Sequence, residues 1–277
     1  MTLNQLQTYI VGVLQGYFPN KAVLDKLSES ADGTLLFNGM QISGEALVTD
    51  AELQQAIEST LIELGVDETI KVKIGDKYYD TLEAAVAAAE EGQTITLLSN
   101  VALSTAIQVT KDLTIDLNGR DIRMPDDPNG DGAFWVKSGT LTINGTNDSI
   151  IDSVGKNGWN IGLFVNGGHA IINGGHFTNV GANTGTDEGN DQFDLIYVKG
   201  GSVTINGGTF SAQTPRWTLN VNNTVGGTIT VKGGTFYQFD PSGATTDDNG
   251  AGNTVNYVAD GYTVTNNNGI YSVIKSV

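Results

Sequence analysis

Leu141-Thr142-Ile143-Asn144-Gly145 is the stretch that decides the fold, because its pattern of apolar, polar, apolar, Asn and Gly recurs along the chain. Further copies are Ile115-Asp116-Leu117-Asn118-Gly119, Ala170-Ile171-Ile172-Asn173-Gly174, Val203-Thr204-Ile205-Asn206-Gly207 and, with Lys for Asn, Ile229-Thr230-Val231-Lys232-Gly233. The closing glycines are 26, 29, 33 and 26 residues apart. A fixed local pattern at an elastic period of this length is typical of a solenoid.

Within each copy, the first and third positions lie on one face of a strand and the second lies on the other. The inward positions are apolar throughout and can stack into one core. We expect the Asn-Gly pair to end the strand at a corner, since both residues tolerate positive φ, and the Asn side chains to form an amide ladder. Phe177, Phe210 and Phe236 follow three of the glycines by three places and should also point inward.

A second short strand precedes each of the last four copies. These strands are Phe134-Trp135-Val136, Leu163-Phe164-Val165, Ile196-Tyr197-Val198 and Leu219-Asn220-Val221. Two strands joined by a glycine corner, then a third strand and a loop of variable length, describe one turn of a parallel β-helix. The sequence therefore predicts a mainly β protein with this architecture over residues 69–277.

The two ends of this repeat region carry their own signals. Asp80 and Glu83 form a capping-box-like start to an Ala-rich helix that ends near Gly92, and this helix should cover the first strands. Residues 258–264 and 270–274 are expected to be a strand pair that closes the other end.

The first 68 residues have a different texture. We expect residues 1–47 to be a mostly helical anchor segment held by partner subunits, and residues 48–68 to be a helical neck. Within the anchor, we expect a short second helix with Ala22, Leu24 and Leu27. Residues 35–42, with Phe37, are expected to form a hairpin around Asn38-Gly39. The anchor's first helix is predicted from the helical spacing of Leu3, Leu6, Ile10, Val13 and Leu14.

Composition limits the partners. Fourteen Lys and Arg against 31 Asp and Glu give a net charge of −17, which argues against binding nucleic acid or an anionic membrane through bulk charge. There are no cysteines, so disulfides and thiolate sites are excluded. The N-terminal residues do not resemble a signal peptide and no apolar run approaches a membrane span, so we expect the chain to begin in the cytoplasm.

Large apolar side chains mark an outward position. If Phe134 and Val136 point inward, then Trp135 points outward, and the same register exposes Phe164 and Tyr197 until Asn220 ends the column. Ile171 also takes an outward position. Such a patch has three interpretations: a subunit contact, a surface covered by a long loop, or a glycan-binding surface.

One loop has the opening of a calcium site. Asp127, Asn129 and Asp131 fit D-x-N-x-D-G, but Ser138 stands where a bidentate Glu is expected. The loop is therefore interpreted as a polar turn with Ca²⁺ as the alternative, and no other cofactor is expected.

Little in the repeats points to catalysis. Their outward positions are mostly Thr and Asn, and His169 and His176 occupy ordinary repeat positions. The loop residues Asp187, Glu188, Asp191 and Asp194 are candidate acids for a polysaccharide-degrading enzyme, but no second acidic cluster faces them. We therefore expect a protein that is not an enzyme.

Two stretches carry a family resemblance. Residues 69–123, above all YYDTLEAAVAAAEEGQTITLLSNVALSTAIQVTKDLTIDLNGRDI, resemble the right-handed, pectin-lyase-like β-helices of Gram-positive surface and phage proteins. The Asp-Asp and Arg-x-Lys signatures of that family's galacturonases are missing. NKAVLDKLSESADGTLLFNGMQI and VTDAELQQAIESTLIEL are similar to N-terminal segments of tailed-phage head fibre proteins.

The resemblance implies a homotrimeric virion protein assembled in the host cytoplasm. Its N-terminus would bind a capsid protein, and its β-helix would be displayed to the host surface or its glycans. Two alternatives remain open: a tail fibre or tailspike-like depolymerase that uses the acids of the 181–194 loop, and an adhesin on a bacterial cell surface.

Overall fold

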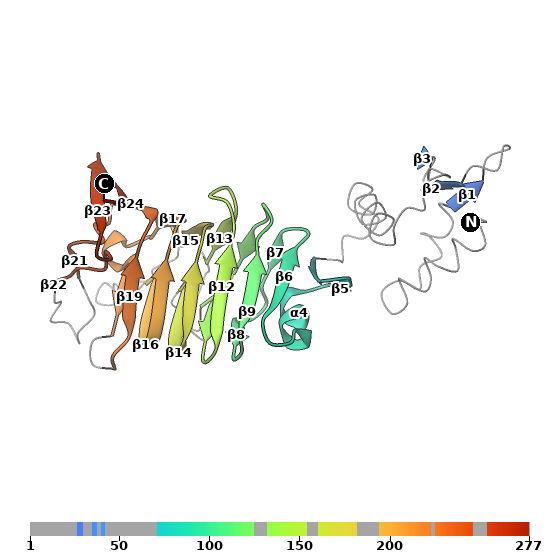
Figure 1. Cartoon of the computed structure of the whole chain (residues 1–277), viewed down its shortest axis with the longest axis horizontal. Helices are drawn as coiled ribbons and strands as arrows, with labels where there is room; N and C mark the ends of the chain where they lie inside the picture. The colour runs from blue at the N-terminus through green and yellow to red at the C-terminus, as the bar shows by residue number, and fades with distance from the viewer. Residues whose placement is uncertain are drawn as a thin grey trace. The chain divides into compact units, whose positions relative to one another are not determined.

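The computed structural model describes residues 71–124, 132–153, 160–181, 194–222, 225–245 and 254–276, together with the backbone of three short strands nearer the N-terminus. The chain divides into two compact units, Met1–Glu68 and Thr69–Val277. The described part is mainly β (Figure 1). No helix within it is long and apolar enough to span a membrane.

In the first unit, β1 (Leu27–Glu29), β2 (Leu35–Phe37) and β3 (Met40–Gln41) form an antiparallel sheet in that order. Phe37 pairs with Met40 on either side of Asn38-Gly39, which confirms the expected hairpin. The assignment of Leu27 to a helix is wrong, because Leu27 pairs with Phe37 in the same sheet.

The other anchor residues, Leu3, Leu6, Ile10, Val13 and Leu14, lie outside the described residues, as does the expected neck at 48–68.

The second unit is built on two sheets that share one core. The larger has eleven strands: β4 (Val72–Ile74), β5 (Lys77–Tyr79), β6 (Gln93–Leu97), β8 (Ile107–Val109), β9 (Leu113–Asp116), β11 (Phe134–Val136), β12 (Thr140–Asn144), β14 (Leu163–Ile172), β16 (Ile196–Ile205), β18 (Leu219–Val221) and β19 (Thr228–Val231). Apart from the antiparallel β4–β5 and β4–β6 pairs, its neighbouring strands run parallel.

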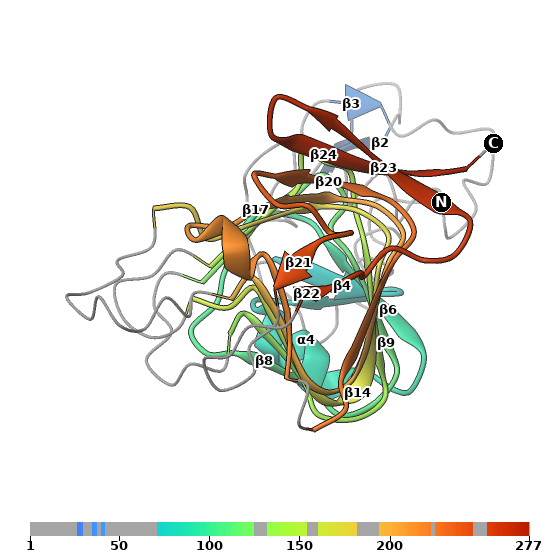
Figure 2. The ribbon, with the colours of Figure 1, turned by 90° about the vertical axis from the view of Figure 1, so that its left-hand side faces the viewer.

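The smaller sheet has eight strands: β7 (Val101–Ala102), β10 (Ile122–Arg123), β13 (Ile150–Asp152), β15 (His176–Thr178), β17 (Thr209–Ser211), β20 (Gly234–Tyr237), β23 (Tyr262–Asn267) and β24 (Ile270–Lys275). Its strands are parallel from β7 to β20 and antiparallel beyond. Figure 2 looks along the stack and shows strands of both sheets curling around one interior. Smaller elements are η1 (Pro215–Trp217) and the pair β21 (Ala244–Thr245) and β22 (Thr254–Val255).

The interior is filled by the apolar positions of the repeats. Leu141, Ile143 and their counterparts are buried in every copy. Phe177, Phe210 and Phe236 are also buried and stack face to face, with ring centroids 5.6 and 4.8 Å apart. The inward direction expected for these three rings is confirmed.

The first copy of the repeat is shifted by two residues from the alignment that the Asn-Gly pairs suggested. Leu113 pairs with Leu141 and Ile115 with Ile143, so Asp116, rather than Asn118, lies beside Asn144. The true first copy is therefore Leu113-Thr114-Ile115-Asp116. Asn118-Gly119 is a separate turn, with φ of 47° and 71°.

The expectation that both Asn and Gly take positive φ is wrong for the later copies. Asn173 and Asn206 do not have positive φ, and they donate their backbone N–H groups to the carbonyl oxygens of Ile143 and Ile172 in the preceding strands. The corner is made instead by the glycine after each pair: φ is +96° at Gly175 and +109° at Gly208.

The expected amide ladder is confirmed. Asn173 Nδ2 donates to Asn144 Oδ1 and Asn206 Nδ2 donates to Asn173 Oδ1, both at 2.8 Å. The strand register places Asp116 beside Asn144, at the donor end of the ladder, and Lys232 beside Asn206, at its acceptor end. The two charges therefore complement the aligned amide dipoles.

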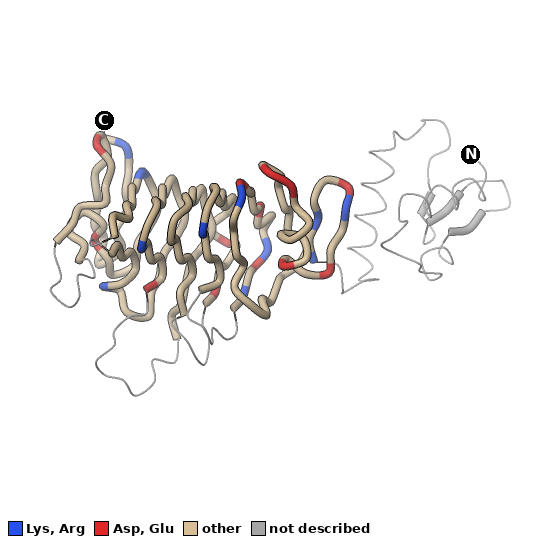
Figure 3. Tube along the Cα trace, turned by 90° about the horizontal axis from the view of Figure 1, so that it is seen from below, with Lys and Arg blue, Asp and Glu red and all other residues tan. Residues whose placement is uncertain are grey.

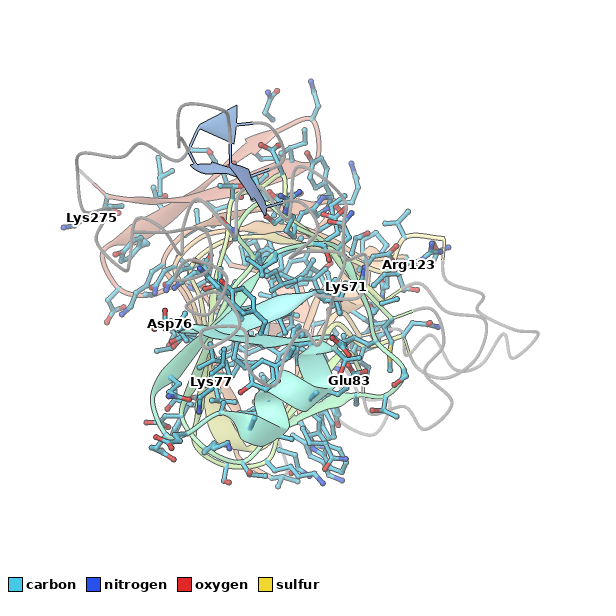
Figure 4. All side chains as sticks on the ribbon, turned by 90° about the vertical axis from the view of Figure 1, so that its right-hand side faces the viewer. Lys71, Asp76, Lys77, Glu83, Arg123 and Lys275 are labelled. Carbon is cyan, nitrogen blue, oxygen red and sulfur yellow. The ribbon has the colours of Figure 1, made fainter. Side chains whose placement is uncertain are left out.

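At one end of the stack, α4 (Leu82–Ala88) and the β4–β5 hairpin lie across the first strands, and Lys71, Asp76, Lys77 and Glu83 are spread around this end (Figure 4). The helix begins one residue later than the capping-box pattern suggested. The Thr81 side chain accepts from the N–H of Ala84, while the Glu83 carboxylate accepts from the N–H and hydroxyl of Ser104.

At the other end, β23 and β24 form a hairpin around Asn268-Gly269, and β24 pairs antiparallel with β20. The expected C-terminal strand pair is confirmed. It extends the smaller sheet beyond its last parallel strand.

Candidate functional site

The outward column of aromatic residues is the strongest candidate site in the described chain. Strands β11, β14 and β16 pair in register, so Trp135 lies beside Phe164 and Phe164 beside Tyr197. The ring centroids are 5.7 and 5.5 Å apart, with interplanar angles of 23° and 9°. We call these three residues the ring column. Each is partly exposed, as the register predicted.

Both ends of the ring column are occupied by neighbouring side chains. Lys137 Nζ lies 3.7 Å from the centroid of the Trp135 ring and donates to Gln108 Oε1 at 2.8 Å. At the other end, Asn222 Nδ2 donates to the Tyr197 hydroxyl at 3.3 Å. The cation over the indole adds to the stacking that stabilises the column.

The stacking of the rings limits what the ring column can bind, because the ring faces are covered by neighbours. Phe164 has a neighbouring ring on each side, and Lys137 lies over Trp135. A sugar that stacks on an aromatic side chain needs an open ring face, and here the rings present mainly their edges. The indole Nε1 of Trp135 is buried with no hydrogen-bond partner in the described structure, so this donor is not offered to a ligand.

Ile171 lies away from the ring column. It follows Phe164 on the same long strand, β14, but it pairs with Thr142 and Thr204 in a separate outward column. The structure does not bring it together with the rings.

Asn220 ends the ring column, because it pairs with Tyr197 and takes the next position on the same face of the sheet. It is fully buried and donates its side-chain amide to the carboxylate of Asp194 at 3.0 Å. Asp194 is 2% exposed. One of the four acids considered for catalysis is therefore part of a buried polar pair. The other three, Asp187, Glu188 and Asp191, lie outside the described residues.

The charge of Asp194 also affects the pKa of Tyr257, which comes from the C-terminal part of the chain. Tyr257 is buried, and burial first, then the Asp194 carboxylate, raise the pKa of its hydroxyl. Tyr257 is therefore neutral at physiological pH. Sequence reasoning missed this grouping, because Asp194, Asn220 and Tyr257 become neighbours only when successive repeats stack.

No group of three or more His, Cys, Asp or Glu that could hold a metal occurs within the described ranges. The calcium candidates Asp127, Asn129 and Asp131 fall in the 125–131 gap between those ranges.

Both histidines occupy the repeat positions expected for them. His169 pairs with Ser202 and its Nδ1 lies 2.8 Å from the Ser202 hydroxyl. His176 pairs with Thr209, and its Nε2 lies 3.0 Å from the Ser211 hydroxyl. Partial burial lowers the pKa of His176, although the charge of Asp152 opposes this shift.

The lowered pKa of His176 predicts a loss of stability in acid. The unfolded chain binds this proton near pH 6.5 and the folded chain at a lower pH, so the contribution is complete above pH 6.5 and declines as the pH falls below it. Below pH 6.5 this contribution gives the free energy of unfolding a slope against pH. We expect His176→Gln to reduce that slope by up to about 1.4 kcal/mol per pH unit. Urea unfolding between pH 5 and 8 measures it. An unchanged slope in this variant would contradict the assignment.

The described structure thus offers a stacked, closed column of rings on a stack of parallel strands. Comparisons with protein-family models, with curated proteins and with solved structures found no match to this chain.

Proposed function

We propose that residues 69–277 form a right-handed parallel β-helix, and that the protein is a non-catalytic virion fibre of a tailed phage. In this proposal, residues 1–47 bind a capsid protein of the phage head, residues 48–68 join three copies, and the β-helix is displayed toward the host surface or its glycans.

The strand register is the observation that carries this proposal. Equivalent residues lie side by side from β9 to β12, β14, β16 and β19, and the amide ladder and the buried phenylalanines repeat along the same direction. A module whose repeats contact mainly their neighbours makes a stiff support. It suits display better than chemistry.

The ring column has a supporting role in this proposal. Its rings stack on one another and on Lys137, so they stiffen the outer face of the larger sheet. Host contact would then use the ring edges and the Lys137 ammonium, with polar or anionic glycans as the matching chemistry.

A depolymerase receives less support than a fibre. That reading needs a pair of accessible carboxylates, and Asp194 is buried against Asn220.

Immunogold electron microscopy of a culture that produces the protein tests the assignment. Antibody against the second unit should label phage heads. Gold on tails would move the fibre to the tail, and gold on bacterial walls without attached particles would overturn the virion assignment. Particles that lack the gene provide the control for unspecific labelling.

A further inference from the structure

The C-terminal hairpin exposes an apolar surface that the proposed function does not use. Tyr237, Ile270 and Ile274 are 41%, 36% and 48% exposed and rank among the most exposed large apolar side chains of the described residues. Tyr237 of β20 pairs with Ile270 of β24, and Ile274 follows Ile270 by four residues. Their side chains therefore lie on one face of the sheet. We call these three residues the terminal patch.

The strand beside the terminal patch is an unprotected edge. β23 ends the order of the smaller sheet and has β24 on one side, with no strand on the other among the described residues. Its sequence, Tyr-Thr-Val-Thr-Asn-Asn, has no charge and no proline. Edge strands usually carry charged residues or proline, which prevent pairing with another chain. The edge of β23 has neither, so it is suited to contact with another chain.

An uncharged surface on so acidic a protein favours another copy of this chain as the partner. Residues 261–274 contain no charged side chain, although the whole chain has a net charge of −17. Figure 3 shows the Asp and Glu residues distributed along the rest of the second unit. Copies of so acidic a protein repel one another over most of their surfaces, and the terminal patch is a place where they can approach without that repulsion.

The ring column is the weaker candidate for the same contact. Its rings are partly buried and stack on one another, whereas the terminal patch consists of exposed side chains. The two surfaces cannot face one common axis, because β8, the neighbour of β11, and β20 lie on different sides of the stack (Figure 2).

We propose that copies of this chain meet through the terminal patch, with three patches packed around the axis of the trimer. This inference rests on the trimer of the proposed function and adds the surface that holds the displayed ends together. Burial of exposed aromatic and aliphatic side chains at the centre of a contact is what provides affinity there.

Cysteine cross-linking in the full-length chain tests the contact, because the protein contains no cysteine of its own. Ile274→Cys, treated with a short bismaleimide, should give covalently linked chains, with a yield that does not fall on dilution. Val180→Cys is the matched control, since Val180 is an apolar residue outside the patch that is at least as accessible as Ile274, at 55% exposed. Adding Tyr237→Asp to Ile274→Cys should reduce the cross-linked fraction roughly tenfold, because a buried carboxylate weakens the contact.

Solution mass separates the possible failures. If the preparation is trimeric but Ile274→Cys links no more than Val180→Cys, the terminal patch is not the contact, and the trimer itself stands. If the protein is monomeric, both the patch contact and the trimer of the proposed function are wrong. Circular dichroism and melting of each variant verify that the fold is retained.

Discussion

Phe210→Ala is expected to lower the free energy of unfolding by about 3 to 5 kcal/mol. Phe210 is fully buried between Phe177 and Phe236, with ring centroids 5.6 and 4.8 Å away. Removing the middle ring leaves a cavity, and the strands on either side cannot close it while the ladder bonds between successive strands persist. Urea unfolding, followed by circular dichroism, measures the loss.

Phe164→Ala is the matched control, because Phe164 is the middle ring of the other three-ring stack but is partly exposed. Its loss should be about 1 to 2 kcal/mol, since water can fill the space that the ring leaves. Equal losses in the two variants would mean that the phenylalanine stack is not the interior of this unit.

Gly174→Ala is expected to cost about 3 kcal/mol or more. A Cβ at this position would lie 2.0 Å from the carbonyl oxygen of Gly145 on the neighbouring repeat. Backbone cannot yield there without separating Asn144 from Asn173, whose side chains bond at 2.8 Å. The φ of Gly174 is not positive, so the effect is steric alone. A thermal melt of the purified variant reports it.

Alanine substitutions at two other glycines serve as controls for this result. A Cβ at Gly207 would lie 3.0 Å from the Asn173 carbonyl oxygen, so Gly207→Ala should be less damaging, and Gly243 has nothing within 4 Å. Gly243→Ala should change stability by no more than about 0.5 kcal/mol. If the three variants melt alike, then the close approach of successive repeats is wrong.

The alternation of the repeats was enough to predict that the second unit is mainly β and which face of its repeat strands is buried. Apolar residues two apart, such as Leu141 and Ile143, indicated the buried face, and that register correctly placed Trp135, Phe164 and Tyr197 outside. This succeeds because alternate side chains of a strand must point to opposite faces. Equivalent residues of successive repeats then lie side by side, so the register of one repeat continues into the next.

The first repeat shows how the same reasoning failed. Asn118-Gly119 drew the alignment two residues too far along the chain, although Leu113-Thr114-Ile115-Asp116 nearly repeats Leu141-Thr142-Ile143-Asn144. Asn-Gly is favoured at any tight turn, so it marks a turn without identifying which one. The inward pair of apolar residues was the better guide to register.

The buried pair of Asp194 and Asn220 and the terminal patch could not be derived from local patterns. Whether an acid is buried depends on which strand lies over it, and Asn220 comes from the next repeat. Ile270 and Ile274 alternate with Tyr271 and Val273, so the sequence alone does not say which face of this strand meets the core. Pairing with β20 decides it.

Sedimentation equilibrium of the intact chain tests the central claim, a trimeric fibre, most directly. The fibre predicts a mass three times the 29.2 kDa of the chain, constant over a wide range of concentration. A single species of 29.2 kDa at every concentration, with the chain shown to be intact, would contradict it.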